Sequence, residues 1–233
     1  MEKTYIKAQK TFKYFWRELS WEKRRIVPSL DLAMVKVAFK EDEKNIEYMW
    51  IDNIYFDGTY IQGVLINEPN SLTNIKNGDK VTIKLDELCD WIFAINREVY
   101  GAFTVNLIRS EMSEEEREEH DKAWGLNFGN PNDIKLVVNG NISEEHPMSL
   151  NMTSSLIKNL KSSNDIIEYR GESKETMLHY EALAGNTSQV KILLEYGIDI
   201  DLENINGMKA IDLAKIMQWD NVIKVIEEKY SND

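Results

Sequence analysis

The pattern of apolar positions near the start of the chain predicts an amphipathic helix. Four apolar side chains recur at positions i, i+3, i+4 and i+7 and so share one helix face: Phe12, Phe15, Trp16 and Leu19. Pro28 limits the length of this helix, because the residue before a proline disfavours helical geometry. We expect the aromatic face to pack on a sheet, and a partner groove or a membrane surface is the alternative.

Between residues 33 and 108 the pattern changes to the alternation of β-strands. Val81, Ile83 and Leu85 alternate with polar residues, and the preceding "NGD" supplies a turn. Further strands are predicted in "NIEYMWIDNIYF", "TYIQGVLIN", "WIFAIN" and "AFTVNLI", and "IKLVVNG" reads as an edge strand. Short connections favour antiparallel neighbours. The expected fold is α+β, with the N-terminal helix packed on a curved antiparallel sheet or partly open barrel.

A highly acidic segment, "SEMSEEEREEHDKAW", follows the strands. Ser113 and Glu116 have the spacing of a capping box, so a helix is predicted to begin at Glu114. Glu116, His120 and Trp124 then share one face, and Glu116 with His120 is a candidate metal pair. Since a zinc site needs more ligands and the chain has only 3 histidines, we expect a solvated helix and no bound metal.

The last part of the chain carries a repeat. Residues 176–186, "TMLHYEALAGN", resemble the ankyrin signature T-P-L-H-x-A-A-x-x-G-N, and a shift of 211 − 178 = 33 residues aligns Leu178 with Ile211. Two repeats are predicted, whereas a stable stack needs about three. Residues 147–168 are therefore expected to form a degenerate capping helical unit that packs through four apolar side chains: Leu150, Leu156, Ile157 and Leu160.

The ankyrin resemblance implies structural roles for Thr176, His179, Gly185 and Gly197. In such a repeat the threonine and the histidine of the signature lie at the start of the first helix and join neighbouring turns by hydrogen bonds. His179 is therefore expected to be structural and not catalytic. Gly197 is expected to give the second helix its left-handed exit.

Length and charge narrow the class of protein. A chain of 233 residues fits one medium domain with a smaller one, and we place an α+β domain at 1–140 and the helical repeats at 141–233. The 28 Lys and Arg against 40 Asp and Glu give a net charge of −12, which disfavours nucleic acid and favours a basic partner. A single cysteine, Cys89, and the lack of a signal-peptide core or membrane span predict a cytoplasmic protein without membrane contact.

A second resemblance covers residues 34–108. "VKVAF", "EYMWID", "GVLINEP", "NGDKV", "CDWIF" and "YGAFTVNLI", in this order, are similar to the YegJ-like family of bacterial domains of unknown function. The resemblance implies a fold and carries no agreed chemistry. Ala102 departs from the second glycine expected beside Gly101. The matching positions are Trp50, Gly63, Asn67, Pro69, Gly78, Asp90, Trp91, Gly101, Phe103 and Thr104.

Four residues of this region form a candidate ligand site: Asn67, Asp90, Trp91 and Thr104. A buried acid or amide beside an aromatic ring can orient a ligand, although Asn67 typically closes a turn and Trp91 typically fills a core. Cys89 has no histidine near it in sequence to activate a thiolate. No cofactor is expected, since P-loop, Rossmann, H-E-x-x-H and Cys-x-x-Cys motifs are missing from the sequence.

The favoured function is a non-enzymatic protein-binding module. Bacterial proteins that pair a YegJ-like domain with ankyrin repeats resemble neutralisers encoded beside toxins, which implies an immunity protein that binds a basic cognate toxin. An enzyme or small-ligand sensor in the YegJ-like domain and a housekeeping scaffold are the alternatives, and the sequence indicates no oligomeric state. The candidate binding residues are Glu114, Glu115, Glu118, Glu119, Glu195, Asp199, Asp201 and Glu203.

Overall fold

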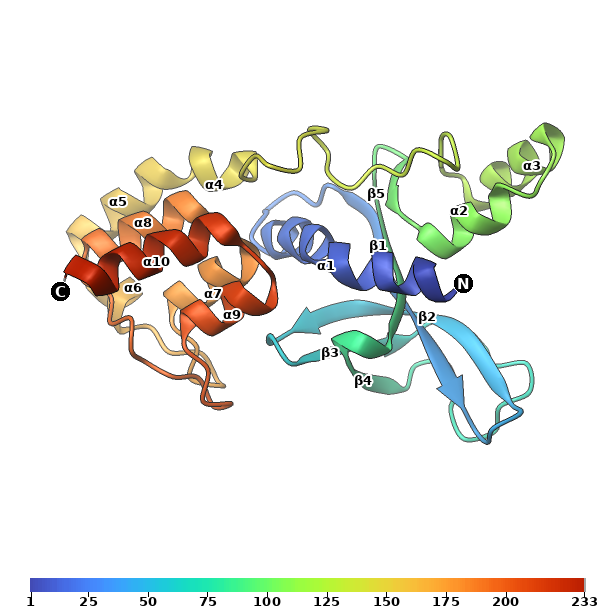
Figure 1. The fold of residues 1–233 in the computed structure, drawn as a ribbon, viewed down its shortest axis with the longest axis horizontal. Helices are drawn as coiled ribbons and strands as arrows, with labels where there is room; N and C mark the ends of the chain where they lie inside the picture. The colour runs from blue at the N-terminus through green and yellow to red at the C-terminus, as the bar shows by residue number, and fades with distance from the viewer. Residues whose placement is uncertain (233) are drawn as a thin grey trace. The chain divides into compact units, whose positions relative to one another are not determined.

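The structure is a computed structural model that describes residues 1–232. By internal packing the chain divides into two compact units, one of residues 1–141 and one that begins at Ile142. Among the described residues, the first unit combines helices with a sheet, and the regular elements of the second are all helices (Figure 1).

Six strands form one open sheet in the first unit. Their spatial order is β4-β3-β2-β1-β5-β6, and each pair of neighbours is antiparallel. Because β4 and β6 lie at opposite edges of this sheet, it does not close into a barrel. The strands are β1 (Leu30–Lys40), β2 (Ile46–Phe56), β3 (Tyr60–Leu65), β4 (Lys80–Lys84), β5 (Leu88–Ile95) and β6 (Glu98–Gly101), and a 3-10 turn, η1 (Leu85–Glu87), precedes β5.

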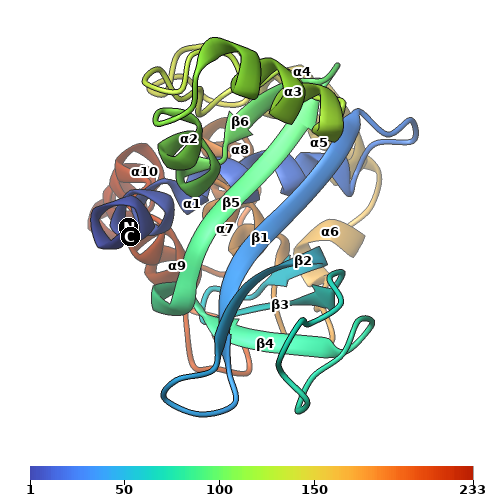
Figure 2. The same ribbon diagram turned by 90° about the vertical axis from the view of Figure 1, so that its right-hand side faces the viewer.

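Helix α1 (Glu2–Glu22) packs on one face of the sheet. Phe12 meets Phe56 edge-on and Phe15 contacts Trp91, so the aromatic stripe of the helix lies in the core. Figure 2 shows α1 passing behind the paired strands β1 and β5. The predicted architecture, an N-terminal helix on an antiparallel sheet, is confirmed.

The opposite face of the sheet carries a second core around α2 (Phe103–Arg109). Burial on both faces explains why β5 is buried from Leu88 to Ala94 and reads as a nearly continuous apolar run. Trp124 and Leu126 pack against this core at its margin. Its buried members are Met34, Trp50, Ile92, Ala94, Val99, Ala102, Val105 and Phe128.

Two predicted strands are wrong. The segment "AFTVNLI" forms α2, because Ala102 adopts a left-handed φ of 57° that ends the extended backbone after β6. The segment "IKLVVNG", residues 134–140, contains turns and no strand. It touches the sheet edge through one backbone hydrogen bond, from Gly101 N to Lys135 O at 2.9 Å.

The acidic helix α3 (Glu114–Trp124) begins where the sequence predicts it. Ser113 Oγ accepts a hydrogen bond from Glu116 N at 3.3 Å, and the Glu116 carboxylate accepts one from Ser113 N at 2.7 Å. Gly125, at a φ of 68°, ends the helix in the left-handed conformation that glycine adopts without steric cost.

The second unit stacks helices in pairs. Within it α7 packs against α9 and α8 against α10, which is the arrangement expected of two ankyrin repeats, and α4 and α5 pack on α8. The helices are α4 (Pro147–Asn151), α5 (Thr153–Ser162), α6 (Asp165–Glu168), α7 (Met177–Ala184), α8 (Thr187–Glu195), α9 (Ala210–Ile216) and α10 (Asp220–Asn232).

The segment predicted to cap the repeats is helical and covers α8. Leu160 is buried there and Ile157 half-buried, as the 33-residue shift predicts. The expectation for Leu150 is wrong, since its side chain is 52% exposed on the short helix α4. None of the helices among residues 1–232 is both long and apolar enough to cross a lipid bilayer.

Candidate functional site

Asp90, Trp91 and Thr104 come together at the start of α2, and all three are buried. The Asp90 carboxylate accepts hydrogen bonds from Trp91 N at 2.8 Å, Phe103 N at 2.9 Å, Thr104 N at 2.7 Å and Thr104 Oγ1 at 2.6 Å. Burial raises the pKa of Asp90, and the bonds from Thr104, Phe103 and Trp91 act in the opposite direction. Asp90 therefore caps the first turn of α2, where amide groups lack partners within the helix.

Trp91 joins the same strand to α1. Its indole Nε1 donates to Ala8 O at 3.0 Å and to Thr11 Oγ1 at 3.1 Å. Gly101 lies against its ring, and a Cβ added to Gly101 would meet the ring at 2.3 Å. The hydrogen-bonding groups of Asp90 and Trp91 are thus engaged within the fold.

Asn67 is not part of this cluster. It is half-buried in the loop after β3, where its Oδ1 accepts a hydrogen bond from Trp50 N on β2 at 2.7 Å. Strand β1 separates β2 from β5 in the sheet. The four residues of the candidate ligand site therefore do not converge on one place.

Lys36 is a neighbour of Asp90 that the sequence reading missed. On β1 it pairs with Trp50 of β2 on one side and with Asp90 of β5 on the other. Its Nζ donates to Thr104 Oγ1 at 3.4 Å and lies over the Trp50 ring. Burial lowers the pKa of Lys36, and the charge of Asp90 raises it. The signal available in the sequence was a lone lysine inside the apolar run "MVKVAF".

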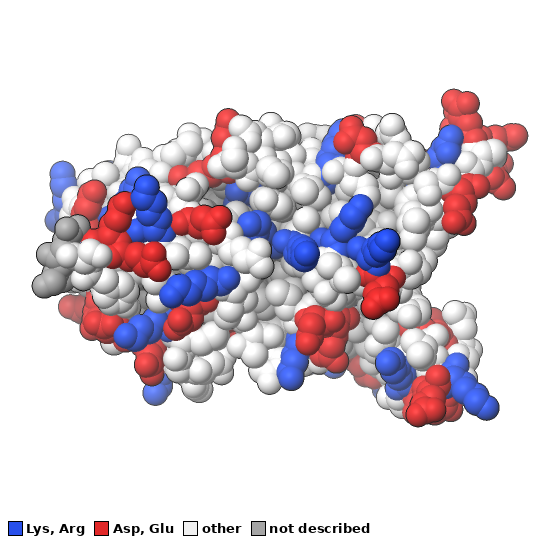
Figure 3. All heavy atoms as spheres, viewed as in Figure 1, with Lys and Arg blue, Asp and Glu red and all other residues white. Residues whose placement is uncertain are grey.

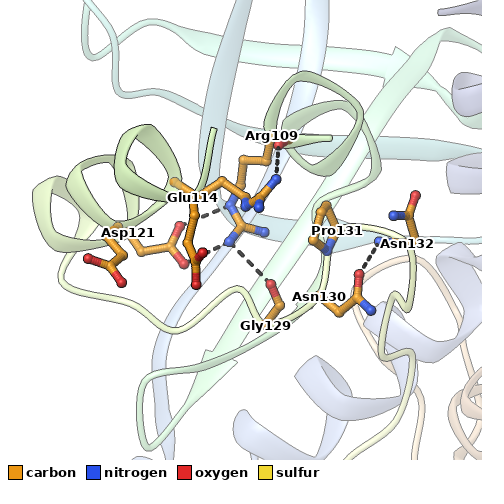
Figure 4. Close-up of a pocket in the computed structure, with 9 residues that line it drawn as sticks. Arg109, Glu114, Asp121, Gly129, Asn130, Pro131 and Asn132 are labelled. Carbon is orange, nitrogen blue, oxygen red and sulfur yellow. Dashed lines mark hydrogen bonds and ion pairs between the residues drawn. The ribbon is translucent and has the colours of Figure 1, made fainter. Parts of the chain in front are cut away.

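A cleft of about 530 Å³ lies between α3 and the loop at residues 129–132 (Figure 4). Its floor is Arg109, which is 2% exposed and forms a two-bond ion pair with Asp121, at 2.9 Å from Nε and 2.8 Å from Nη2. Arg109 also donates to Asn106 Oδ1 at 2.7 Å and to Gly129 O at 3.2 Å. This buried arginine fastens α2, α3 and the loop together, and the sequence reading missed it.

The four candidate binding acids of α3 divide into two pairs. Glu114 and Glu118, one helical turn apart, line the cleft, whereas Glu115 and Glu119 do not. All four side chains are exposed, and Figure 3 shows acidic side chains gathered over α3. Within residues 1–232 none of these four forms an ion pair.

Glu116 and His120, the candidate metal pair, each have another partner in the structure. Glu116 is held by Ser113, and His120 Nδ1 lies 2.9 Å from Asp121 Oδ1. In the part of the chain that the structure describes, no three His, Cys, Asp or Glu side chains are grouped as metal ligands.

The remaining candidate acids lie in the second unit, in or beside its fingers, which are the loops at residues 169–176, before α7, and at residues 196–209, between α8 and α9. Glu195, Asp199, Asp201 and Glu203 are exposed there. Asp201 is partly neutralised, since Lys209 Nζ lies 2.7 Å from its Oδ1. Asp199 Oδ1 accepts a hydrogen bond from Asp201 N at 2.9 Å and keeps the finger turned.

His179 bridges two neighbouring fingers. Its Nε2 donates to Met208 O at 2.9 Å, and its Nδ1 accepts from Thr176 N at 3.2 Å. Burial lowers the pKa of His179, and the bond to Met208 raises it. Both ring nitrogens are used, so the ring has no free atom to offer a substrate.

Two glycines of the repeat have left-handed backbones. Gly185 has a φ of 73° and Gly197 a φ of 81°. A Cβ on Gly185 would also meet the Trp219 ring at 2.5 Å, and Trp219 Nε1 donates to Leu183 O at 3.1 Å. Because Gly185 has no side chain, Trp219 of the second repeat can pack directly on the backbone of the first repeat.

Known proteins resemble both units. An ankyrin repeat protein of Neisseria meningitidis serogroup B is 46% identical over 231 residues, 96% of this chain and 91% of the relative. The YegJ protein of Escherichia coli K12 is 26% identical over 78 residues, 34% of this chain and 51% of the relative. The Notch-regulated ankyrin repeat-containing protein of Xenopus laevis is 30% identical over 100 residues, 42% of this chain and 81% of the relative.

No solved structure shows significant similarity to this chain. A family model described as "Uncharacterized protein conserved in bacteria (DUF2314)" matches residues 1–128, which include the whole sheet and helices α1 to α3. The resemblance to YegJ-like domains and to ankyrin repeats is thereby confirmed. The chain belongs to the DUF2314 family and joins that domain to helical ankyrin-type repeats.

Proposed function

We propose that the chain is a protein-binding module that neutralises a basic cognate toxin by direct contact. The observation that carries the proposal is that eight exposed acids, on α3 and near the fingers, have almost no ion-pair partners within the part of the chain that the structure describes. Only Asp201 among them forms an ion pair within residues 1–232. Unpaired surface carboxylates attract a basic partner and speed its association.

The repeats supply the second line of support. Relatives that match this part of the chain are named as ankyrin repeat proteins. A stack of helix pairs held by buried residues such as His179 and Trp219 offers a rigid surface, and rigidity lowers the entropic cost of binding. The proposed role needs no cofactor and no reaction.

The proposal places the chain in the cytoplasm, in keeping with its single buried and unpaired cysteine, Cys89. A housekeeping scaffold would use the same surfaces, so the identity of the partner decides between the two. Contact with membranes or nucleic acid is not part of the proposed role.

A growth assay tests this function. The protein encoded next to this chain would be expressed in a bacterial host, alone and together with the chain. We expect the neighbour to arrest growth and co-expression of the chain to restore it. A neighbour without toxicity, or toxicity that the chain leaves unchanged, contradicts the immunity proposal.

A further inference from the structure

The cleft between α3 and residues 129–132 differs from a typical small-molecule pocket. Such pockets are mostly apolar and enclose their ligand. This one is open, and its walls are charged or amide-bearing apart from Gly129 and Pro131. Its shape and lining therefore fit a side chain presented by another protein better than a small apolar ligand.

The charges around the cleft are of two kinds. Arg109 and Asp121 neutralise each other at the floor, and Arg117 Nη1 donates to Met112 O at 2.8 Å. Glu114 and Glu118 remain without an ion pair among the described residues. The hydrogen bond to a neutral carbonyl leaves Arg117 its positive charge, so the groups of the cleft without an ion pair among residues 1–232 sum to −2 + 1 = −1. An incoming group therefore meets a charge that is negative overall.

We propose that the cleft receives an arginine side chain of the basic partner, with its guanidinium between the carboxylates of Glu114 and Glu118. A planar guanidinium carries five N–H donors and can serve two carboxylates at once, which a lysine ammonium does less well. Pro131, on the opposite wall, contacts the aliphatic stem. The inference rests on the proposed function for the charge of the partner.

The Arg109–Asp121 pair keeps the cleft in shape before the arginine arrives. Arg109 is held by α2, α3 and the carbonyl of Gly129 at once. A preformed receptor loses little conformational freedom on binding. The buried pair is thus a positioning element and does not itself contact the partner.

The two acidic pairs of α3 supply a matched experiment. Glu114→Gln with Glu118→Gln removes the two carboxylates of the cleft, and Glu115→Gln with Glu119→Gln removes two that lie outside it. Each double variant removes one charge from the first turn and one from the second, so the effect on the helix dipole is matched.

The full-length chain, labelled with ¹⁵N, would be titrated with the peptide acetyl-Gly-Arg-Gly-Arg-Gly-amide, and then with its lysine counterpart. We expect amide shifts at residues 114–118 and 129–132, and tighter binding of the arginine peptide. The E114Q/E118Q variant should bind it about 3- to 30-fold more weakly, whereas E115Q/E119Q should bind like the wild type.

Equal weakening by both double variants, or shifts confined to other surfaces, would overturn the proposal. If E114Q/E118Q lowers the helix content, the single variants E118Q and E119Q repeat the comparison away from the helix start. The titration needs no natural partner, so a failed growth assay leaves its result intact. Conversely, a toxin that binds E114Q/E118Q as well as wild type overturns the cleft proposal alone.

Discussion

Asp90 shows how one buried side chain fixes the turn from sheet to helix. Four donors from Trp91, Phe103 and Thr104 converge on its carboxylate. This arrangement gives Asp90 a structural task, because each of those donors would otherwise be buried without a partner.

Asp90→Asn should destabilise the first unit. The amide replaces one acceptor oxygen by a donor, so buried N–H groups at the start of α2 lose their partner. We expect the free energy of unfolding to fall by about 2–3 kcal/mol. Urea unfolding followed by tryptophan fluorescence would measure it, with the exposed Asp86→Asn as control. An unchanged midpoint for Asp90→Asn would refute the capping role.

Gly101→Ala tests a close approach. The new Cβ would lie 2.3 Å from the Trp91 ring and 2.4 Å from its carbonyl oxygen, at a φ of 74°. We expect a loss of about 3–5 kcal/mol, from overpacking and backbone strain together. Gly125→Ala has a similar φ of 68° and nothing within 4 Å, so it should lose only about 1 kcal/mol. Equal losses in thermal unfolding would contradict this explanation.

Individual residues differ in how well the sequence predicts them. The structural interpretation of His179 agrees with its two hydrogen bonds, because the ankyrin signature specifies both the residue and its neighbours. Arg109 was missed, because its partner Asp121 and the carbonyl of Gly129 meet it only through tertiary folding. Ala102, at a φ of 57°, keeps the left-handed backbone that the glycine expected there from the YegJ-like resemblance would favour.

At the scale of elements, the spacing of apolar residues predicts α1 and most strands but not α2. "AFTVNLI" is apolar and β-branched enough to read as a strand. Its conformation is decided by the Asp90 cap and by packing against β5, and both arise from distant parts of the chain. The capping box of α3, by contrast, is local and therefore predictable.

The loop between β3 and β4 should loosen in acid. The Glu47 carboxylate accepts hydrogen bonds from Ser71 Oγ at 2.6 Å, Asn70 N at 2.9 Å and Leu72 N at 3.2 Å. These bonds, that of Ser71 first, lower the pKa of Glu47 from 4.5 to about 2. The stabilisation is therefore complete above pH 4.5 and is lost as the pH falls toward about 2.

Amide hydrogen exchange at residues 70–72 over this pH range would measure the effect. Protection should decline between pH 4.5 and about 2 in the wild type. In Glu47→Gln it should be low throughout and independent of pH. A Glu47 carboxyl that titrates near 4.5 would contradict the account.

The contact between the two repeats should depend on pH through His179. Burial lowers its pKa below the ordinary 6.5. As the pH falls below 6.5, His179 is therefore protonated in the unfolded chain before it is protonated in the folded chain. The stabilisation is complete above about pH 6.5 and is lost as the pH falls, by at most about 1.4 kcal/mol per pH unit. Urea unfolding between pH 7.5 and 5 would show this slope, and His179→Gln should reduce it. A slope unchanged in the variant would assign the effect elsewhere.

At the scale of the whole molecule, family membership and architecture were readable from the sequence because ordered motifs run through both units. The cleft was not, since its walls come from α2, α3 and a loop whose proximity no local pattern encodes. The acidic residues that carry the proposed function could nevertheless be identified from the sequence, because charge is a property of each residue and does not depend on the fold.

The most direct measurement is affinity capture of the tagged chain from a lysate of its own bacterium, at low and moderate salt. The stoichiometry of the retained proteins would be measured. The test variant, D199N/E203Q, removes two acids beside the fingers. The control variant, E43Q/E227Q, removes two exposed acids in other parts of the chain. We predict one basic partner, retained in equimolar amount, weakened by salt and by D199N/E203Q but not by the control. No retained protein, or an acidic partner indifferent to salt and to D199N/E203Q, would contradict the account.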